Sequence, residues 1–182
     1  DTKQYSVAKT NTTVDLVAFT IEDGELKTVL IKRTEEPFMG LSALPGGFLW
    51  EGETTAEATS RILKTKVGVT DVFSEQLYTF DSPGRDPRGR IITVSYFSLI
   101  PVEKLRANKL QDGVTIEPLG SLKNLAFDHD KILAYALKRL QAKLAYTNIA
   151  YSLLGESFTL TELQNIYETI LNKQIDKRNF RK

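Results

Sequence analysis

Residues 46–69, GGFLWEGETTAEATSRILKTKVGV, constrain the fold most, because a glycine-rich loop leads there into one helical stretch set between strand-like segments. Residues 13–21 and 27–33 precede it, and residues 72–80 and 88–100 follow it. The EDGE segment with Gly24 predicts a hairpin turn, which makes the first two strands antiparallel neighbours. We therefore predict an α/β sandwich with a mixed sheet around a helix that begins near Thr54.

The second half of the chain has a different pattern. Apolar residues recur at helical spacing from 130 to 144, which predicts a connecting helix capped by Asp128 or Asp130. His129, the single histidine, is interpreted as a structural residue at this junction. Thr159 and Glu162 then form a capping box before an apolar stripe, and a second helix follows. We predict a domain over residues 1–128, a connecting helix over 129–145 and a second domain over 146–182.

Composition excludes several classes of protein. The 182 residues carry a formal net charge of +1 and contain no cysteine, so disulfides, thiolate metal sites and cysteine nucleophiles are excluded. Any basic surface must be local. No apolar run reaches the roughly 18–20 residues of a membrane span, and the first residues lack the apolar core of a signal peptide. We expect a cytoplasmic protein without a membrane partner.

The opening segment resembles the Nudix box, G-x5-E-x7-R-E-U-x-E-E-x-G-U, in which U is aliphatic. The matching positions are Gly47, Glu53, Arg61, Leu63, Gly68 and Val69, while Ile62, Thr65 and Lys66 replace the three glutamates of the box helix. In the family these glutamates share one helical face and hold Mg²⁺ or Mn²⁺ against a diphosphate. The remaining acids Glu51, Glu53 and Glu57 would hold one weakly bound ion at best, and Lys66 would oppose it. The resemblance therefore implies no catalytic residue, no metal, no cofactor and no efficient hydrolysis.

The whole chain is similar to the Nudix-related transcriptional regulators of the NrtR type. The resemblance rests on SPGRDPRGRIITVSYFSLIP, LAFDHDKILAYALKRL and FTLTELQNIYETILNKQIDKRNFRK. It implies a Nudix α/β/α sandwich followed by an α-rich winged helix-turn-helix domain, incomplete in this chain, that binds double-stranded operator DNA. It also implies an effector such as ADP-ribose, a nucleotide or a phosphorylated sugar.

Three functions follow from this comparison of motifs. The first is a ligand-responsive DNA-binding regulator that acts as a homodimer, since helix-turn-helix proteins commonly read paired half-sites. The second is an active or residual Nudix hydrolase of ADP-ribose or a related nucleotide diphosphate. The third is a metabolite-binding domain whose partner is another protein.

Candidate effector residues are positively charged or belong to the box. Arg85 and Arg88 lie in a Gly- and Pro-rich loop, where guanidinium groups could pair with phosphate or face water in a hairpin connection. The same two alternatives apply to Arg33, at the end of the second strand. Glu53 is expected near the ligand as well, although with Arg61 it also braces the loop and the helix. Trp50 is interpreted as a core residue rather than a platform for adenine.

Candidate DNA-binding residues gather in the last predicted helix, which Asp176 caps. They are Lys177, Arg178, Asn179, Arg181 and Lys182. Asn179 can pair with an adenine edge, and we assign Arg178 and Asn179 to bases and Lys177 and Arg181 to the backbone. The alternative is a solvated basic face without a partner.

Overall fold

A computed structural model describes residues 6–180 and contains a mixed sheet of seven strands. The strands are β1 (Asn11–Glu22), β2 (Glu25–Lys32), β3 (Ser42–Ala43), β4 (Gly46–Phe48), β5 (Phe73–Phe80), β6 (Ile91–Leu99) and β7 (Val114–Pro118). Their order is β3-β2-β1-β6-β5, while β4 pairs with β1 and β7 pairs with β2. The four predicted strands are confirmed, and the short β3, β4 and β7 were not predicted.

The longest strand, β1, lies in the middle of the sheet and contributes side chains to the cores on both faces of the sheet. It runs parallel to β6 from Asn11 beside Ile91 onward, and antiparallel to β2. The β1–β2 connection is the predicted hairpin, with Gly24 at φ 71°. Because successive side chains alternate between faces, Leu16 joins the core on one side of the sheet and Val17 the core on the other.

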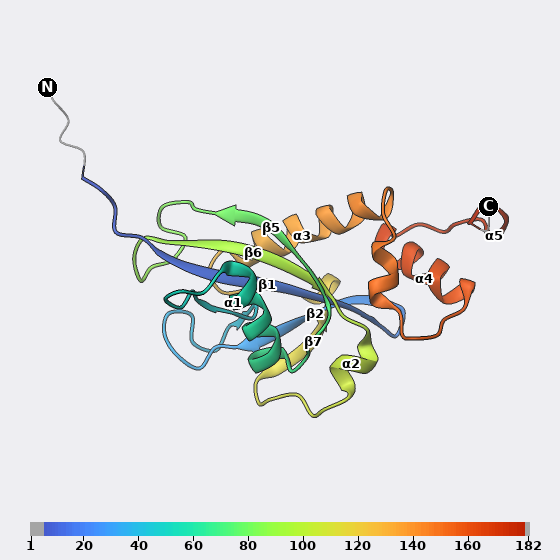
Figure 1. Ribbon diagram of the computed structural model, residues 1–182, viewed down its shortest axis with the longest axis horizontal. Helices are drawn as coiled ribbons and strands as arrows, with labels where there is room; N and C mark the ends of the chain where they lie inside the picture. Colours follow the sequence, from blue (N-terminus) through green and yellow to red (C-terminus); the bar gives the residue numbers. More distant parts are fainter. Residues whose placement is uncertain (1–5, 181–182) are drawn as a thin grey trace, which may run out of the picture.

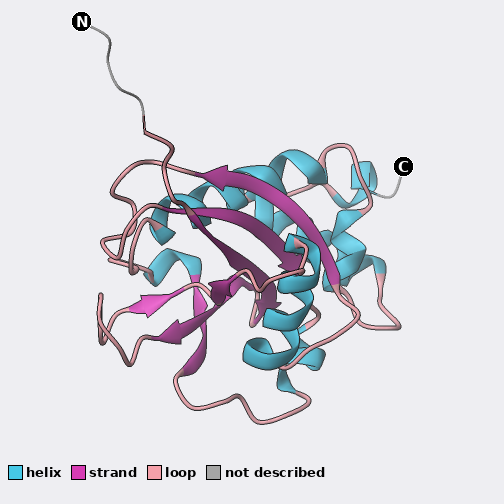
Figure 2. Ribbon diagram, turned by 60° about the vertical axis from the view of Figure 1, so that its left-hand side comes forward, coloured by secondary structure: helices cyan, strands magenta, loops and turns pink. Residues whose placement is uncertain are grey.

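Helices cover both faces of this sheet (Figures 1 and 2). They are α1 (Thr55–Ile62), the π-helix η1 (Leu63–Val67), α2 (Val102–Arg106), the 3-10 helix η2 (Leu119–Ser121), α3 (His129–Leu144), the 3-10 helix η3 (Ile149–Leu153), α4 (Leu160–Leu171) and α5 (Lys177–Phe180). The core under α1 and η1 and the core under α3 are separate clusters. The arrangement is the predicted α/β/α sandwich.

Helix starts follow the capping chemistry of the sequence. The side chains of Thr54 and Thr159 each accept the backbone N–H of the glutamate three residues later. The carboxylate of that glutamate in turn accepts the backbone N–H of the threonine. Asp128 occupies the N-cap position of α3, but its side chain makes no capping hydrogen bond there. The prediction that Asp128 occupies the N-cap position is thus confirmed, but the prediction that its carboxylate caps the helix is wrong.

The core beneath α3 continues into the C-terminal helices, which lie at one end of the molecule (Figure 1). Leu140 of α3, Leu153 of η3 and Ile166 of α4 are buried in the same cluster as Phe19 and Phe97 of the sheet. Gln141 of α3 also donates to the backbone of α4. The described chain therefore packs as one body, and the domain boundaries remain predictions. None of the helices within residues 6–180 has the length and apolarity that crossing a membrane requires.

Candidate functional site

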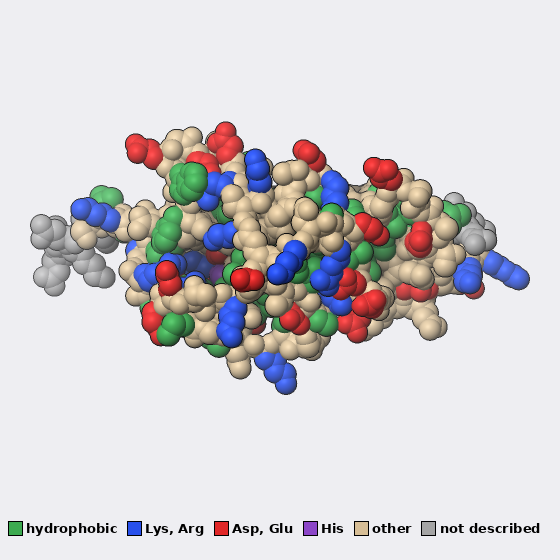
Figure 3. All heavy atoms as spheres, turned by 90° about the horizontal axis from the view of Figure 1, so that it is seen from below, with side chains coloured by type: hydrophobic (Ala, Val, Ile, Leu, Met, Phe, Trp, Pro, Cys, Tyr) green, Lys and Arg blue, Asp and Glu red, His purple; other side chains and the backbone are tan. Residues whose placement is uncertain are grey.

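A cavity of about 310 Å³ opens where the glycine-rich loop, the box helix and the start of α3 meet. His129 lines this cavity, and the space-filling view shows lysine and arginine side chains around a hollow on this face of the molecule (Figure 3). The cationic lining residues are Lys32, Arg33, Lys66, Arg85 and Arg88, and the acidic ones are Asp15, Glu35 and Asp86. This excess of positive charge suits an anionic ligand.

The loop that enters β4 forms one wall of the cavity because Gly46 lets two strands approach closely. A Cβ atom added at Gly46 would lie 2.2 Å from the Asp15 carboxylate and 2.7 Å from the carbonyl oxygen of Val14. At Gly47 the nearest atoms would be the flexible ends of Lys66 and Arg61, at 3.9 and 4.0 Å. Gly46 is therefore required for strand packing, whereas Gly47 leaves space on the cavity side.

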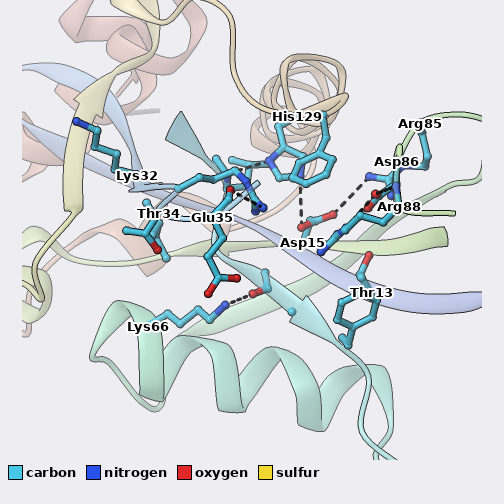
Figure 4. A pocket seen from close by; sticks show the side chains of 18 residues that line it. Thr13, Asp15, Lys32, Thr34, Glu35, Lys66, Arg85, Asp86, Arg88 and His129 are labelled. Atoms are coloured by element: carbon cyan, nitrogen blue, oxygen red, sulfur yellow. Dashed lines mark hydrogen bonds and ion pairs between the residues drawn. The ribbon is translucent and has the colours of Figure 1, made fainter. Parts of the chain in front are cut away.

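A buried charge network lies behind the cavity and joins β1, the 81–90 loop and α3 (Figure 4). Arg85 donates two hydrogen bonds to Asp128, of 2.9 and 2.7 Å, and its guanidinium lies 3.6 Å from Asp15. His129 accepts the N–H of Leu44 through Nδ1 at 3.0 Å, so the Nε2 that faces Asp15 at 3.5 Å carries the proton. This network fixes the start of α3 against the sheet.

The pKa values of the network follow from burial and pairing. Burial raises the pKa of the Asp15 carboxyl, but His129, Thr93 and Arg85 outweigh it and hold the pKa below its usual range. Burial lowers the pKa of Arg85, yet its bonds to Asp128 and the charge of Asp15 leave the pKa raised. Both groups are therefore charged at neutral pH.

Two guanidinium groups flank Phe127 at the mouth of the cavity. Arg33 lies 4.8 Å from the centre of the Phe127 ring and donates to the carbonyl oxygen of Pro37 at 2.6 Å. Arg88 lies 5.2 Å from the same ring and makes a two-point ion pair with Asp86, of 3.0 and 2.7 Å. The Arg88 side chain is 37% exposed. Arg33 and Arg88 can thus reach a ligand more readily than the buried Arg85.

Glu53 belongs to the brace of the box rather than to the cavity lining. Its carboxylate accepts from Arg61 at 2.7 and 2.9 Å and from the N–H of Trp50 at 3.0 Å. The Arg61 hydrogen bond lowers the pKa of Glu53 to about 2. Arg61 also donates to the carbonyl oxygen of Phe48 and lies 3.8 Å from the centre of the Trp50 ring. The predicted bracing contact between Glu53 and Arg61 is present.

The interpretation of Trp50 as a core residue is wrong. Its side chain is 62% exposed, and Phe48 two residues earlier is 41% exposed. Strand β4 ends at Phe48, so Trp50 lies in the loop that follows it and does not pack in the sheet core. Phe48 lines the cavity, while Trp50 lies beyond it under Arg61.

The three positions where the family has glutamates do not share one face. Ile62 is fully buried in the core beneath the box helix, and Thr65 is exposed, with its hydroxyl donating to the carbonyl oxygen of Arg61. Lys66 lines the cavity. Helical geometry changes at this point, because α1 ends at Ile62 and the next five residues form a π-helix, which widens the turn. The common helical face that the family's glutamates share, carried over to positions 62, 65 and 66, is therefore not present in this chain.

The residues present do not fit a divalent cation. Within residues 6–180 no group of three or more His, Cys, Asp or Glu side chains could hold a metal ion. Glu53 is engaged by Arg61, and Glu57 by its own capping box. A hard cation needs several carboxylate or carbonyl oxygens, and Lys66 would repel it.

The C-terminal segment has the geometry of two helices joined by a fixed turn. Asn172 ends α4 with φ 51°, a left-handed conformation that asparagine tolerates. Glu168 accepts the N–H of Ile175 at 2.8 Å, and Gln164 donates to the carbonyl oxygen of Ile175 at 2.8 Å. Asp176 then accepts backbone N–H groups of α5, as predicted.

The basic residues of α5 face solvent where the structure describes them. Lys177, Arg178 and Asn179 are exposed, whereas Phe180 packs against Tyr167 with ring centres 5.5 Å apart. Arg181 and Lys182 lie outside the described residues. The helix thus presents its polar side outward, and its assignment to DNA remains a prediction.

Sequence reasoning missed Asp15, Asp86 and Phe127 as parts of the site. Asp15 carried a usable signal, because it is a lone carboxylate within the apolar run TVDLVAFTI. Asp86 and Phe127 carried none, since their importance depends on partners that come together only in the fold. Of the four predicted effector residues, Arg33, Arg85 and Arg88 line the cavity and Glu53 does not.

Comparison with known proteins places these features in a family. Residues 10–136 match the NUDIX domain, and residues 150–182 match the NrtR DNA-binding winged helix domain. The chain is 39% identical over 176 residues to the ADPR responsive transcriptional repressor NtrR of Acinetobacter baylyi, covering 93% of this chain and 70% of that protein. It is also 39% identical over 107 residues to the ADP-ribose pyrophosphatase of Methanocaldococcus jannaschii, covering 59% of this chain and 63% of that protein.

Solved structures of Shewanella oneidensis NrtR are similar to this fold. The complex with a 27mer DNA has a TM-score of 0.85 at 36% identity, covering 93% of this chain and 80% of that one. The NUDIX domain in complex with ADP ribose has a TM-score of 0.66 at 36% identity, covering 74% and 90%. With its Nudix domain, its altered box helix and its winged helix segment, the chain belongs to the NrtR-type Nudix-related transcriptional regulators.

Proposed function

We propose that this protein is a DNA-binding transcriptional repressor that binds ADP-ribose in the cavity of its Nudix domain and does not hydrolyse it. The observation that carries this proposal is a combination of two features in one chain. One is a cationic cavity whose residues do not fit a metal ion, and the other is a winged helix segment with exposed basic residues. The repressor of Acinetobacter baylyi is similar along 93% of this chain.

Within the cavity, Arg33 and Arg88 are our candidates for contact with the phosphates. Both flank Phe127 at the mouth, and guanidinium groups bind phosphate oxygens through paired hydrogen bonds. Arg85 and Glu53 have a supporting role, because Arg85 is buried in its pair with Asp128, whereas Arg88 is partly exposed, and Glu53 is held by Arg61 outside the cavity lining. The flat ring of Phe48, which lines the cavity and is partly exposed, offers a stacking surface for a base.

On the DNA side, Lys177, Arg178 and Asn179 are available for contact. The fixed turn at Ile175 holds α5 against α4, which supports the insertion of this short helix as a unit. A homodimer would place two such helices on paired half-sites of an operator in the cytoplasm.

The alternative function is residual hydrolysis of ADP-ribose, which the similarity to a pyrophosphatase supports. Hydrolysis by this fold requires a metal ion to bind the diphosphate and to activate water. The side chains at positions 62, 65 and 66 supply no carboxylate for it. We therefore expect ADP-ribose to bind and to be released unchanged.

The experiment measures DNA binding and turnover in the same preparation. Fluorescence anisotropy with the DNA upstream of the protein's own operon is recorded with and without ADP-ribose, and AMP release is followed in the presence of Mg²⁺. We expect specific DNA binding that ADP-ribose weakens, and AMP release no faster than in buffer with Mg²⁺ alone. Turnover at catalytic protein concentration, or DNA affinity that does not respond to ADP-ribose, would refute the proposal.

A further inference from the structure

We propose that the ammonium group of Lys66 takes the place of the metal ion of Nudix enzymes and binds the diphosphate of the ligand directly. Ligand binding by this chain would then require no divalent cation. The inference rests on the proposed function, because it assumes that a diphosphate ligand occupies the cavity.

The position of Lys66 supports this role. It comes from the π-helix η1, which forms the C-terminal end of the box helix, and its amino group extends into the cavity (Figure 4). Nζ donates to the carbonyl oxygen of Gly46, and a Cβ atom added at Gly47 would lie 3.9 Å from it. The ammonium therefore lies against the glycine backbone that forms the cavity wall.

Lys66 retains the capacity to bind a ligand. An ammonium group has three donors, and within residues 6–180 the Gly46 carbonyl oxygen is the acceptor found for Lys66. No carboxylate of the described chain lies within 4.0 Å of its Nζ, in contrast to Arg85 and Arg88, which have bidentate carboxylate partners. Lys66 is thus a half-buried cation whose charge is not neutralised by an ion pair.

The electrostatic environment also favours an anion beside this group. Burial lowers the pKa of Lys66, and the neighbouring charges of Arg61 and Arg33 act in the same direction, while Asp15 opposes them. A phosphate next to the ammonium would stabilise its charged form and offset this unfavourable environment. The ligand and the protonated lysine should therefore stabilise each other.

The exchange of a metal for an ammonium also accounts for binding without hydrolysis. A divalent ion both neutralises the diphosphate and lowers the pKa of a bound water so that hydroxide can attack. An ammonium group can neutralise and orient the phosphates, but it has no site at which to activate a water. A ligand held in this way persists as a signal.

The test is calorimetric titration of the full chain with ADP-ribose, once with excess EDTA and once with millimolar Mg²⁺. Lys66→Met removes the charge, Lys66→Glu restores the carboxylate of the family, and Lys64→Met, at an exposed lysine outside the cavity lining, is the matched control. Adenosine serves as a probe without phosphate.

We expect the unmodified protein to bind ADP-ribose equally in both buffers. Lys66→Met should weaken this binding roughly 10- to 100-fold, the loss of one or two charge-assisted hydrogen bonds, without changing adenosine binding. Lys66→Glu should bind ADP-ribose weakly in EDTA and recover in part with Mg²⁺, and Lys64→Met should behave like the unmodified protein.

The results separate the two hypotheses. Mg²⁺-dependent binding by the unmodified protein, or unchanged affinity in Lys66→Met, would overturn the role of Lys66 and leave the proposed function intact. An equal loss of adenosine and ADP-ribose binding would reduce Lys66 to a structural residue and would also overturn the inference. Failure of the unmodified protein to bind ADP-ribose in either buffer would remove the proposed function itself.

Discussion

Replacing Arg85 by methionine tests whether this residue is a structural brace or a ligand contact. Methionine keeps most of the aliphatic volume and removes the charge, so the carboxylates of Asp128 and Asp15 lose their partner. The Arg85 side chain is 3% exposed, and loss of one member of a buried pair typically costs about 3–5 kcal/mol. We expect the lower end of this range, about 3 kcal/mol, because the adjoining cavity lets water reach the carboxylates.

The assay is urea unfolding followed by circular dichroism. With an m-value of about 2 kcal/mol/M for a chain of this size, the expected loss moves the midpoint down by about 1.5 M. Asp128→Asn should restore part of the stability when it is combined with Arg85→Met, since it removes one unpaired charge. The control is Arg90→Met, in the same loop, whose guanidinium donates to the carbonyl oxygen of Asp81 and has no ion pair within residues 6–180, so that its loss should cost less than about 1 kcal/mol.

The result that would refute this reasoning is specific. If Arg85→Met lost less than about 1 kcal/mol of stability while its affinity for ADP-ribose fell at least about tenfold, Arg85 would be a ligand contact with little structural role. Equal stability changes for Arg85→Met and Arg90→Met would likewise show that the buried network contributes nothing measurable to folding.

Three further outcomes follow from the loop and the box. Gly46→Ala should destabilise the protein by about 1–3 kcal/mol in urea unfolding because its Cβ would meet fixed oxygens, and Gly47→Ala, as the matched variant, should be nearly neutral. The hydrogen bond from Arg61 lowers the pKa of Glu53 to about 2, so this ion pair stabilises the fold fully above the ordinary pKa of about 4.5. Glu53→Gln should therefore reduce the free energy of unfolding at pH 7. The difference between the variant and the unmodified protein should vanish as the pH falls from 4.5 to 2. Fluorescence of Trp50, the sole tryptophan, should be quenched by acrylamide in the folded protein nearly as well as in urea, and strong protection would contradict its exposure.

Local chemistry made much of the fold predictable from the sequence. The β1–β2 hairpin, the two capping boxes and α3 depend on residues within a few positions of one another, so the sequence carries their signals directly. Strand β7 escaped prediction because its five residues alternate only partly and its pairing with β2 joins segments far apart in the chain. The π-helix also escaped, since no local signal in residues 63–67 distinguishes it from a continued α-helix.

The site was less predictable for the same physical reason. Arginines in a Gly- and Pro-rich loop could be recognised as ligand candidates, but their partners could not, and the partners determine what each arginine does. Arg85 lies 43 residues from Asp128, and Arg88 only two from Asp86, yet both are paired. Lys66 was visible only as a residue that opposes a metal, until the fold placed it at the cavity wall.

Helix α3 connects the charge network behind the cavity to the C-terminal helices. Its first turn lies in the charge network behind the cavity through Asp128 and His129, and its last turns pack on the C-terminal helices through Leu140 and Leu144. A ligand can change DNA affinity only by binding more tightly to one of two arrangements of the protein. Because the buried core is continuous from the sheet to α4, a shift of α3 at the cavity cannot occur without repacking at its other end. The ion pairs that fix the start of α3 are therefore the contacts whose rearrangement a ligand would have to favour.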